Sequence, residues 1–125
     1  MNRILLVDDE PHMRRLSELS LRKGGYELLF GADGEDAIVQ AKAGHPDLII
    51  MDVMMPRMDG LTALRHLKAD TETKAIPVIM LTARGHVLTR QEATDSGAAL
   101  FITKPFSPSL LLAEVQKILT SEPQQ

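Results

Sequence analysis

Acidic residues follow two of the apolar runs in this sequence, at the point where each run stops. Asp8 and Asp9 come directly after the run from Ile4 to Val7, and Asp52 follows the uninterrupted run from Leu48 to Met51. An isolated carboxylate is costly to remove from water, so a carboxylate that ends a buried strand is poorly placed for packing. Acids in these places either serve chemistry at the rim of a sheet or have no function there, and the other strands decide between the two.

Two other apolar runs also end on a polar side chain. Thr82 follows the run from Pro77 to Leu81, and Lys104 follows the run from Leu100 to Thr103. Four to eight apolar residues bounded by turn residues predict strands that are buried on both faces, as in a parallel sheet. The more polar run from Glu27 to Phe30 predicts a further strand near an edge, with nothing of evident chemistry at its end.

Helical patterns alternate with these runs. Pro11 suits the first turn of a helix, and Gly24-Gly25 predicts where that helix ends. The predicted helices cover residues 13–23, 35–43, 61–68 and 87–96, and a last one begins at Pro108. Strands that alternate with helices predict an α/β fold with a parallel sheet, right-handed crossovers and helices on both faces. We expect one domain in residues 1–120 and a polar tail in residues 121–125.

The carboxyl ends of parallel strands share one edge, where ligands bind in open α/β sheets. Two carboxylates there repel each other by about 4 kcal/mol at a separation of about 4 Å and an effective dielectric constant near 20. Either one carboxylate takes up a proton or a divalent cation lies among them. Oxygen ligands, with no His or Cys at metal spacing, favour Mg²⁺ or Mn²⁺. With Asp52 as nucleophile, Lys104 as a positive charge and Thr82 as a hydroxyl donor, the set could receive a phosphoryl group and form an aspartyl phosphate.

Simpler structural roles compete with this interpretation. Asp8 and Asp9 could begin the following helix, because Asp is a good N-cap. Lys104 alone would be a solvated lysine. Pro56 and Asp59-Gly60 indicate loop geometry, and we assign them no chemistry. The histidines lack ligand spacing and are expected at the surface: His12, His45, His66 and His86.

The overall composition argues against several classes of function. The chain has 125 residues and a net charge of −3, so no broad basic surface is available for nucleic acid. It contains no cysteine, which excludes disulfides and thiolate metal sites. No apolar run approaches the length of a membrane span, and the first residues are too short for a signal peptide. We expect a soluble cytoplasmic domain that binds neither membrane nor nucleic acid directly.

Four segments, read in order, cover essentially the whole chain: LLVDDE, DLIIMDVMMPRMDG, VIMLTA and GAALFITKPF. Together they resemble the receiver domains of two-component response regulators, in the CheY-like superfamily. The resemblance implies a flavodoxin-like (βα)5 fold, a doubly wound parallel sheet with strand order 2-1-3-4-5. It also implies that Asp52 accepts the phosphoryl group. Mg²⁺ would be bound directly by Asp9, Asp52 and the backbone carbonyl of Met54, and by Asp8 through a water.

The same resemblance implies roles for residues of the later strands. Thr82 and Lys104 match the switch hydroxyl and the phosphate-binding lysine, and the Lys104–Pro105 peptide is expected to be cis. Phe101 matches an aromatic residue that turns inward when Thr82 moves toward the phosphoryl group. That movement would reshape a surface formed by the fourth helix, the fifth strand and the fifth helix.

The implied phosphodonor is a phosphohistidine on a sensor histidine kinase or a histidine phosphotransfer protein, and the implied target is a protein that docks on the reshaped surface. Met54 and Arg84 occupy positions that tune the lifetime of the acyl phosphate. Leu110 and Glu114 stand where winged-helix regulators usually carry the Glu and Arg of a phosphorylation-induced dimer. We therefore expect a monomer or weak dimer, either stand-alone or excised from a longer regulator with a DNA-binding or enzymatic output domain.

Two other functions fit parts of the pattern. A Mg²⁺-dependent phosphohydrolase would use the same aspartyl intermediate, but Met54 lies two residues after Asp52, where a general acid is needed. A flavin-binding module on the same fold needs a neutral phosphate cradle after the first strand, and the acidic segment 8–11 would repel a phosphate. Our leading hypothesis is a phosphoacceptor switch that catalyses only its own phosphorylation and dephosphorylation.

Overall fold

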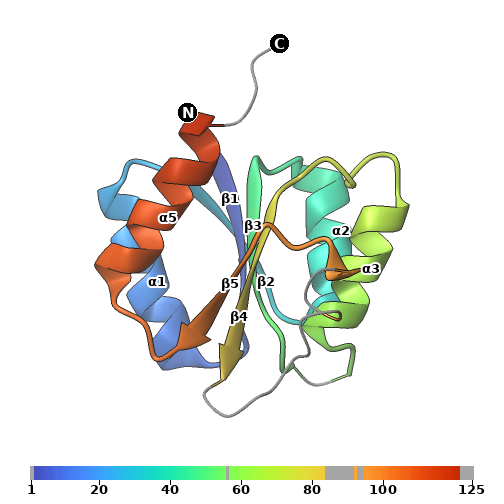
Figure 1. Ribbon diagram of the computed structural model, residues 1–125, viewed down its shortest axis with the longest axis horizontal. Coiled ribbons are helices and arrows are strands. Elements are labelled where there is room, and N and C mark those ends of the chain that lie inside the picture. Colours follow the sequence, from blue (N-terminus) through green and yellow to red (C-terminus); the bar gives the residue numbers. More distant parts are fainter. Residues whose placement is uncertain (1, 56, 84–91, 93–94, 122–125) are drawn as a thin grey trace.

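Strands and helices alternate along the first 83 residues of the chain, and a further strand and helix lie near its end, as Figure 1 shows. The computed structural model describes residues 2–55, 57–83, 92 and 95–121. Within them the strands are β1 (Arg3–Val7), β2 (Glu27–Gly31), β3 (Leu48–Asp52), β4 (Val78–Ala83) and β5 (Leu100–Lys104). The helices are α1 (Pro11–Lys23), α2 (Gly34–Gly44), α3 (Gly60–Ala69) and α5 (Pro108–Ser121).

The five strands form one parallel sheet in the order β2-β1-β3-β4-β5. β1 pairs with both β2 and β3, so that Leu5 lies beside Leu29 on one side and Ile49 on the other. This order confirms the flavodoxin-like α/β fold that the resemblance implies. β2 is an edge strand, as its more polar sequence predicts.

Apolar side chains cover both faces of the sheet. In Figure 1, α2 and α3 lie on one face and α1 and α5 on the other. Every residue of β3 is buried, because neighbouring strands and helices enclose it on all sides. Each fully buried leucine or isoleucine side chain contributes about 2 kcal/mol through the area it removes from water. This core holds the strand ends, and therefore any site built on them, in fixed positions.

Side-chain caps define where two of the helices begin. Asp33 precedes α2 and accepts a hydrogen bond from the Asp36 N–H at 2.9 Å. Asp59 precedes α3 and accepts one from the Thr62 N–H at 2.8 Å. Asp59, to which the sequence analysis assigned no chemistry, therefore has the structural role of an N-cap.

The strands extend slightly further than the sequence predicts. Asp52 and Lys104 are the last residues of β3 and β5, and Thr82 lies inside β4, whereas all three were expected just beyond the strands. α5 continues to Ser121, one residue into the expected tail, and the domain boundary stays a prediction. The predicted helix 87–96 lies mostly outside the described residues. Within the part of the chain that the structure describes, the helices are too short or too polar to cross a membrane.

Candidate functional site

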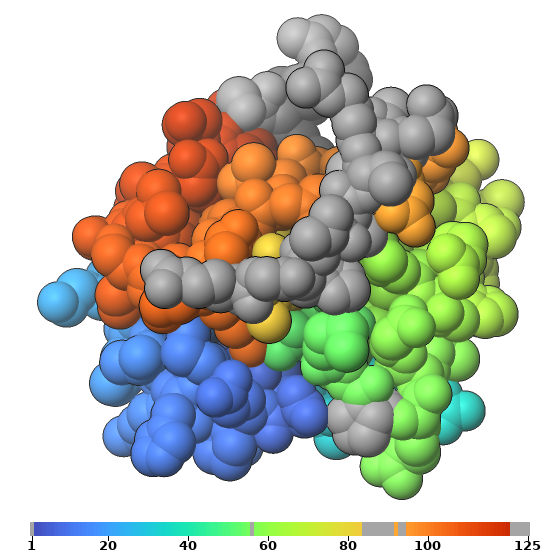
Figure 2. All heavy atoms as spheres, turned by 60° about the horizontal axis from the view of Figure 1, so that its bottom comes forward, coloured from blue at the N-terminus to red at the C-terminus, as the bar shows by residue number. Residues whose placement is uncertain are grey.

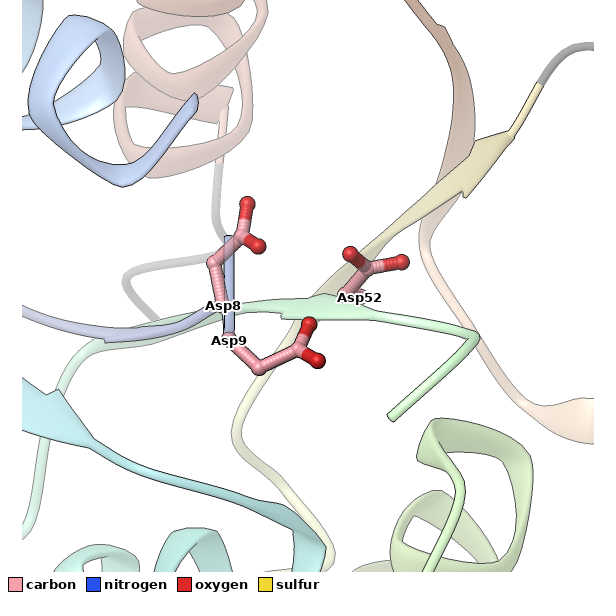
Figure 3. A group of neighbouring side chains, drawn as sticks. All are labelled: Asp8, Asp9 and Asp52. Carbon is pink, nitrogen blue, oxygen red and sulfur yellow. The ribbon is translucent and has the colours of Figure 1, made fainter. Parts of the chain in front are cut away.

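Asp8, Asp9 and Asp52 lie together at the carboxyl end of the sheet. Asp8 and Asp9 directly follow β1, and Asp52 ends β3, the neighbouring strand. One carboxylate oxygen from each residue lies within 4.8 Å of the other two, and Figure 3 shows the three side chains leaving the adjacent strand ends. Asp8 and Asp52 are buried, whereas Asp9 is exposed. The acids that the sequence pattern brings to one edge therefore form a single cluster.

Lys104 places a positive charge inside this cluster. Its Nζ is 2.6 Å from Asp52 Oδ2 and 3.2 Å from Asp8 Oδ2, and its side chain is only 11% exposed. Burial lowers the pKa of Lys104, but its hydrogen bond to Asp52 and the charges of Asp8 and Asp52 outweigh burial and raise the pKa overall. The ammonium group is therefore charged at neutral pH and donates a short, charge-assisted hydrogen bond to Asp52.

Asp8 is fully buried beside Lys104. Its Oδ1 accepts a hydrogen bond from the Glu10 N–H at 2.9 Å, and among the described residues no donor makes a hydrogen bond to its Oδ2. Burial raises the pKa of Asp8, and the charge of Asp52 adds to the rise, against the opposing effects of the Glu10 N–H and Lys104. A buried carboxylate whose Oδ2 is contacted only by the Lys104 ammonium among the described residues, next to two other carboxylates, fits a divalent cation that prefers oxygen ligands.

The loop that leaves β3 is fixed close to Asp52. Asp52 Oδ1 accepts a hydrogen bond from the Met54 N–H at 3.2 Å. The Val53 N–H donates to the Leu81 carbonyl and the Gly60 N–H donates to the Val53 carbonyl, each at 2.8 Å. A Cβ on residue 60 would lie 2.1 Å from the Asp52 carbonyl oxygen, so a glycine is needed for α3 to begin this close to the strand.

Thr82 and Phe101 lie on the two strands beyond β3. Thr82 is buried near the end of β4, the strand that pairs with β3 at Asp52. Phe101 is half-buried on β5 and packs against the core on the face covered by α2 and α3. The peptide bond between Lys104 and Pro105 is cis, the geometry that the resemblance implies.

The remaining residues singled out in the sequence are more peripheral. Met54 is 55% exposed at the start of the β3–α3 loop. Arg84 lies outside the described residues, and so does His86. The other three histidines are exposed, as expected: His12, His45 and His66.

The site has room on its open side. Figure 2 shows the face on which the start of α1 (blue), the β3–α3 loop (green) and the segment around the end of β5 (orange) meet. A cleft of about 300 Å³ lies there beside Lys104, and it is lined by Glu10, Met13, Ala83, Lys104 and Pro105. Three carboxylates and one ammonium beside an open cleft can hold a cation and present one carboxylate to an incoming electrophile.

The sequence matches the response regulator receiver domain family over residues 4–116, which contain all of these site residues. The chain is a response regulator receiver domain. It is therefore the receiver domain of a two-component response regulator, which favours the phosphoacceptor switch over the phosphohydrolase and the flavin module.

Two relatives of this receiver domain are longer regulators. It is 40% identical over 119 residues to the DNA-binding dual master transcriptional regulator RpaA of Synechocystis. It is 38% identical over 117 residues to the phosphate regulon transcriptional regulatory protein PhoB of Escherichia coli. The matches cover 95% and 94% of this chain but 49% and 51% of the two relatives. The receiver domain thus spans about half the length of the curated relatives it matches.

Solved structures of other receivers superpose closely on this one. The chemotaxis response regulator CheY4 of Vibrio cholerae is 34% identical, with a TM-score of 0.87 over 95% of this chain and 99% of CheY4. The receiver domain of the sensor histidine kinase PA1611 of Pseudomonas aeruginosa is 32% identical, with a TM-score of 0.87 over 96% of this chain and 98% of that one. That second structure has a magnesium ion coordinated in its active-site cleft.

Sequence reasoning missed two contacts around the site of the receiver domain. Glu10 Oε1 lies 3.5 Å from Lys104 Nζ, and the acidic pair before Glu10 could have suggested this contact. The end of β2, where we expected no chemistry, is followed by Asp33, which pairs with Arg57 of the β3–α3 loop. These two residues are 24 positions apart, and Asp33 with the following glycine has the sequence of an ordinary turn, so no local signal indicates the pair.

Proposed function

We propose that Asp52 is the phosphoacceptor of this receiver domain and that the donor is a phosphohistidine on a sensor histidine kinase or a histidine phosphotransfer protein. The observation that supports this most strongly is the 2.6 Å contact between Lys104 Nζ and Asp52 Oδ2, inside a cluster of three carboxylates. The contact with Lys104 fixes the orientation of the buried Asp52 carboxylate. After transfer, the Lys104 ammonium group could bind an oxygen of the phosphoryl group instead of the carboxylate. An ion pair with a purely structural role at the surface would need neither a buried carboxylate nor further carboxylates around the same ammonium group.

In the proposed transfer, an oxygen of the Asp52 carboxylate attacks the phosphorus atom of the donor. The new O–P bond forms as the P–N bond to the donor imidazole breaks, and the electron pair of that bond remains on the imidazole nitrogen. Lys104 would shift from the carboxylate to an oxygen of the transferred group, and the hydroxyl of Thr82 would donate a hydrogen bond to another. Binding and positioning are thus the tasks of the chain in this reaction.

Asp8, Asp9, Asp52 and the backbone carbonyl of Met54 would hold Mg²⁺, with Asp8 acting through a water; Mn²⁺ would fit the same oxygen ligands. The close approach of three carboxylates to one another beside a single ammonium group supports this assignment, because Lys104 cannot neutralise all of them. When bound, the cation would supply positive charge that offsets the repulsion between the acids and an incoming phosphoryl group.

The phosphorylated form would alter protein contacts through Thr82 and Phe101. Phe101 lines a cleft of about 410 Å³ between β5 and α5, together with Phe106, Leu110 and Glu114. Movement of Thr82 toward the phosphoryl group would open space for the Phe101 ring, and the shape of this cleft would change. A downstream protein that binds here would then distinguish the two forms.

The output of the switch would depend on whether the receiver acts alone or within a longer regulator. RpaA and PhoB are transcriptional regulators about twice the length of this chain. A receiver taken from such a regulator would act through a DNA-binding partner domain, and a stand-alone receiver would act through protein contacts only. We expect a monomer or weak dimer in either case, because Leu110 and Glu114 stand where winged-helix regulators usually carry the Glu and Arg of a phosphorylation-induced dimer.

Phosphoryl incorporation tests the proposed acceptor. Incubation with acetyl phosphate and Mg²⁺ should add one phosphoryl group per chain, seen by intact-protein mass spectrometry and removed by hydroxylamine. Asp52→Asn should abolish the addition, and so should a chelator of divalent cations. Asp47→Asn is the matched control, because Asp47 lies just before the opposite end of the same strand. Labelling of Asp52→Asn at the native rate would refute the proposal.

We also propose that Met54 and Arg84 set the lifetime of the acyl phosphate. The exposure of Met54 at the start of the β3–α3 loop supports a role in controlling the approach of water. Met54→Asn and Arg84→Ala should each change the dephosphorylation rate, measured as loss of phosphoprotein after removal of the donor. Unchanged rates in both variants would discard this role.

A further inference from the structure

Arg57 and Asp33 join the β3–α3 loop to the start of α2. Arg57 Nε and Nη2 lie 3.1 and 3.0 Å from Asp33 Oδ2. The other oxygen of Asp33 accepts a hydrogen bond from the Asp36 N–H at 2.9 Å, and Asp33 is only 7% exposed. The two oxygens of Asp33 are thus divided between two tasks: one caps α2 and the other binds the loop.

A second contact holds the same two segments together. A Cβ on Gly34, the first residue of α2, would lie 2.5 Å from the Met58 carbonyl oxygen, so the loop passes directly over the helix start. Between these contacts Arg57 has a φ of 67°, in the left-handed region that residues with a Cβ disfavour. A residue stays in this conformation only when its surroundings determine it. The Arg57 side chain is 70% exposed, and among the described residues its ion-pair partner is Asp33.

The loop that Arg57 holds also carries Met54. At its start, the Met54 N–H donates to Asp52 Oδ1, and at its end the Gly60 N–H donates to the Val53 carbonyl. Those bonds fix the two ends of the loop beside Asp52, while the Arg57–Asp33 pair fixes its middle. A backbone that is held at three points loses little freedom when one of its carbonyls binds a ligand, and the affinity for that ligand rises accordingly.

We propose that Arg57 and Asp33 are a positioning pair that orders the β3–α3 loop and thereby increases the affinity of the site for Mg²⁺. This inference rests on the proposed function, in which Asp52 and the Met54 carbonyl bind the cation. Neither member of the pair is a ligand: both act through the conformation of the loop. The Asp36 N–H and Arg57 hold the pKa of Asp33 below its usual range, so its carboxylate is charged at neutral pH.

Four variants test the pair in the full chain. Arg57→Asn removes the guanidinium group but tolerates the positive φ, and Arg57→Lys keeps one positive charge. Asp33→Asn keeps an oxygen that can cap α2 and removes the negative charge, and the double variant Asp33→Asn with Arg57→Asn removes the pair. Arg65→Asn, on the exposed side of α3, is the control for loss of a nearby positive charge.

Two measurements are made on each variant. Amide hydrogen exchange of the loop, without metal, should be about tenfold faster in Arg57→Asn and Asp33→Asn, and unchanged in Arg65→Asn. The Kd for Mg²⁺, measured by calorimetry, should rise about three- to tenfold in Arg57→Asn and in Asp33→Asn. The Kd of the double variant should rise no further than that of the single variants, and the Kd of Arg57→Lys should rise less.

Separate outcomes overturn the inference and the proposed function. Native loop exchange and native Mg²⁺ affinity in both single variants would overturn the positioning pair, and so would fully additive effects in the double variant. If the wild-type chain itself fails to bind Mg²⁺, the proposed metal site is wrong, and loop exchange still reports whether the pair orders the loop.

Discussion

Lys104 contacts more carboxylates than one ammonium group can neutralise. Its Nζ lies within 3.5 Å of oxygens from Asp8, Glu10 and Asp52. Two of these acids are buried. Removal of one partner from a buried group of charges is more costly than the pairing itself suggests, because the remaining charges stay desolvated. The charge balance around Lys104 therefore controls how the folded state responds to mutation and to pH.

Lys104→Met should destabilise the fold in a pH-dependent way. Methionine fills a similar volume but leaves Asp8 and Asp52 without their cation, so the free energy of unfolding at pH 7 should fall by about 1–3 kcal/mol. At pH 4 the loss should be smaller, because protonation relieves the repulsion between the acids. Urea unfolding at both pH values measures this, with Lys117→Met as the control for loss of an exposed lysine. Equal losses at the two pH values would show that packing, rather than charge, explains the effect.

Asp8→Asn should stabilise the metal-free protein. Burial raises the pKa of Asp8, so the folded state binds a proton there more tightly than the unfolded chain does. Stability must then fall as pH rises from about 4, the ordinary carboxyl pKa, through the raised value. The asparagine keeps an oxygen for the Glu10 N–H and removes this fall, so the variant should have a higher free energy of unfolding than the wild type at pH 7.

The measurement for Asp8→Asn is the free energy of unfolding in urea, between pH 3 and pH 7 and with a chelator present. The difference in the free energy of unfolding between Asp8→Asn and the wild type should increase in favour of the variant as pH rises across this range. Asp9→Asn changes an exposed member of the same cluster and is the control. A variant that loses stability relative to the wild type toward pH 7 would contradict the assigned direction of the Asp8 shift.

At the scale of elements, the strands could be predicted because burial on both faces leaves a clear signal. The uninterrupted apolar run from Leu48 to Met51 is enough by itself to predict a buried strand. The position of Asp52 at the end of that strand can be predicted from the same run. Because parallel strands share an edge, the sequence was enough to place Asp8, Asp9 and Lys104 beside it.

Contacts between loops and helix ends carried no such signal. The approach of Gly60 to the Asp52 carbonyl and the pairing of Asp33 with Arg57 depend on distances between segments that only the packed core fixes. In the sequence, Asp59-Gly60 and Asp33-Gly34 are ordinary turn residues, since Asp and Gly favour turns wherever they occur. Helix caps and close backbone contacts around the site therefore could not be predicted from the sequence and are known only from the structure.

Gly60→Ala should disturb the site as well as the fold. The added Cβ would lie 2.1 Å from the Asp52 carbonyl oxygen, so β3 or the start of α3 must shift. We expect a loss of about 1–3 kcal/mol in unfolding free energy and at least a tenfold slower phosphorylation by acetyl phosphate.

Gly25→Ala is the matched substitution for that experiment. Gly25 has a φ of 86° with open space around its Cα, so alanine there is strained without touching the site. It should cost about 1 kcal/mol of stability and leave the phosphorylation rate near that of the wild type. Equal phosphorylation rates in the two variants would show that the contact of Gly60 with Asp52 has no role in the site.

At the scale of the whole molecule, the two ends of the sheet use acids differently. Near the amino-terminal end, Asp47 accepts a hydrogen bond from the Arg3 N–H at 2.8 Å, and its own N–H donates to the Arg3 carbonyl at 2.7 Å. At the carboxyl end, Asp8 and Asp52 face each other across neighbouring strands with one lysine between them. The hydrogen bonds of Asp47 join two neighbouring strands and leave no charge repulsion. The carboxylates of Asp8 and Asp52 repel each other, and a bound cation can relieve that repulsion.

This difference predicts that Mg²⁺ stabilises the whole fold through one end of the sheet. A ligand that binds only the folded state adds about 1.4 kcal/mol when its concentration is ten times its Kd, which corresponds to a rise in Tm of about 4–6 °C for a domain of this size. Calorimetric scans across a MgCl₂ series, against NaCl at matched ionic strength, measure the effect. Asp9→Asn and Asp52→Asn should each remove most of the rise, and Asp47→Asn should retain it. An equal rise in NaCl, or a full rise in Asp52→Asn, would mean that the ion acts on the general charge of the protein and not at the acidic cluster.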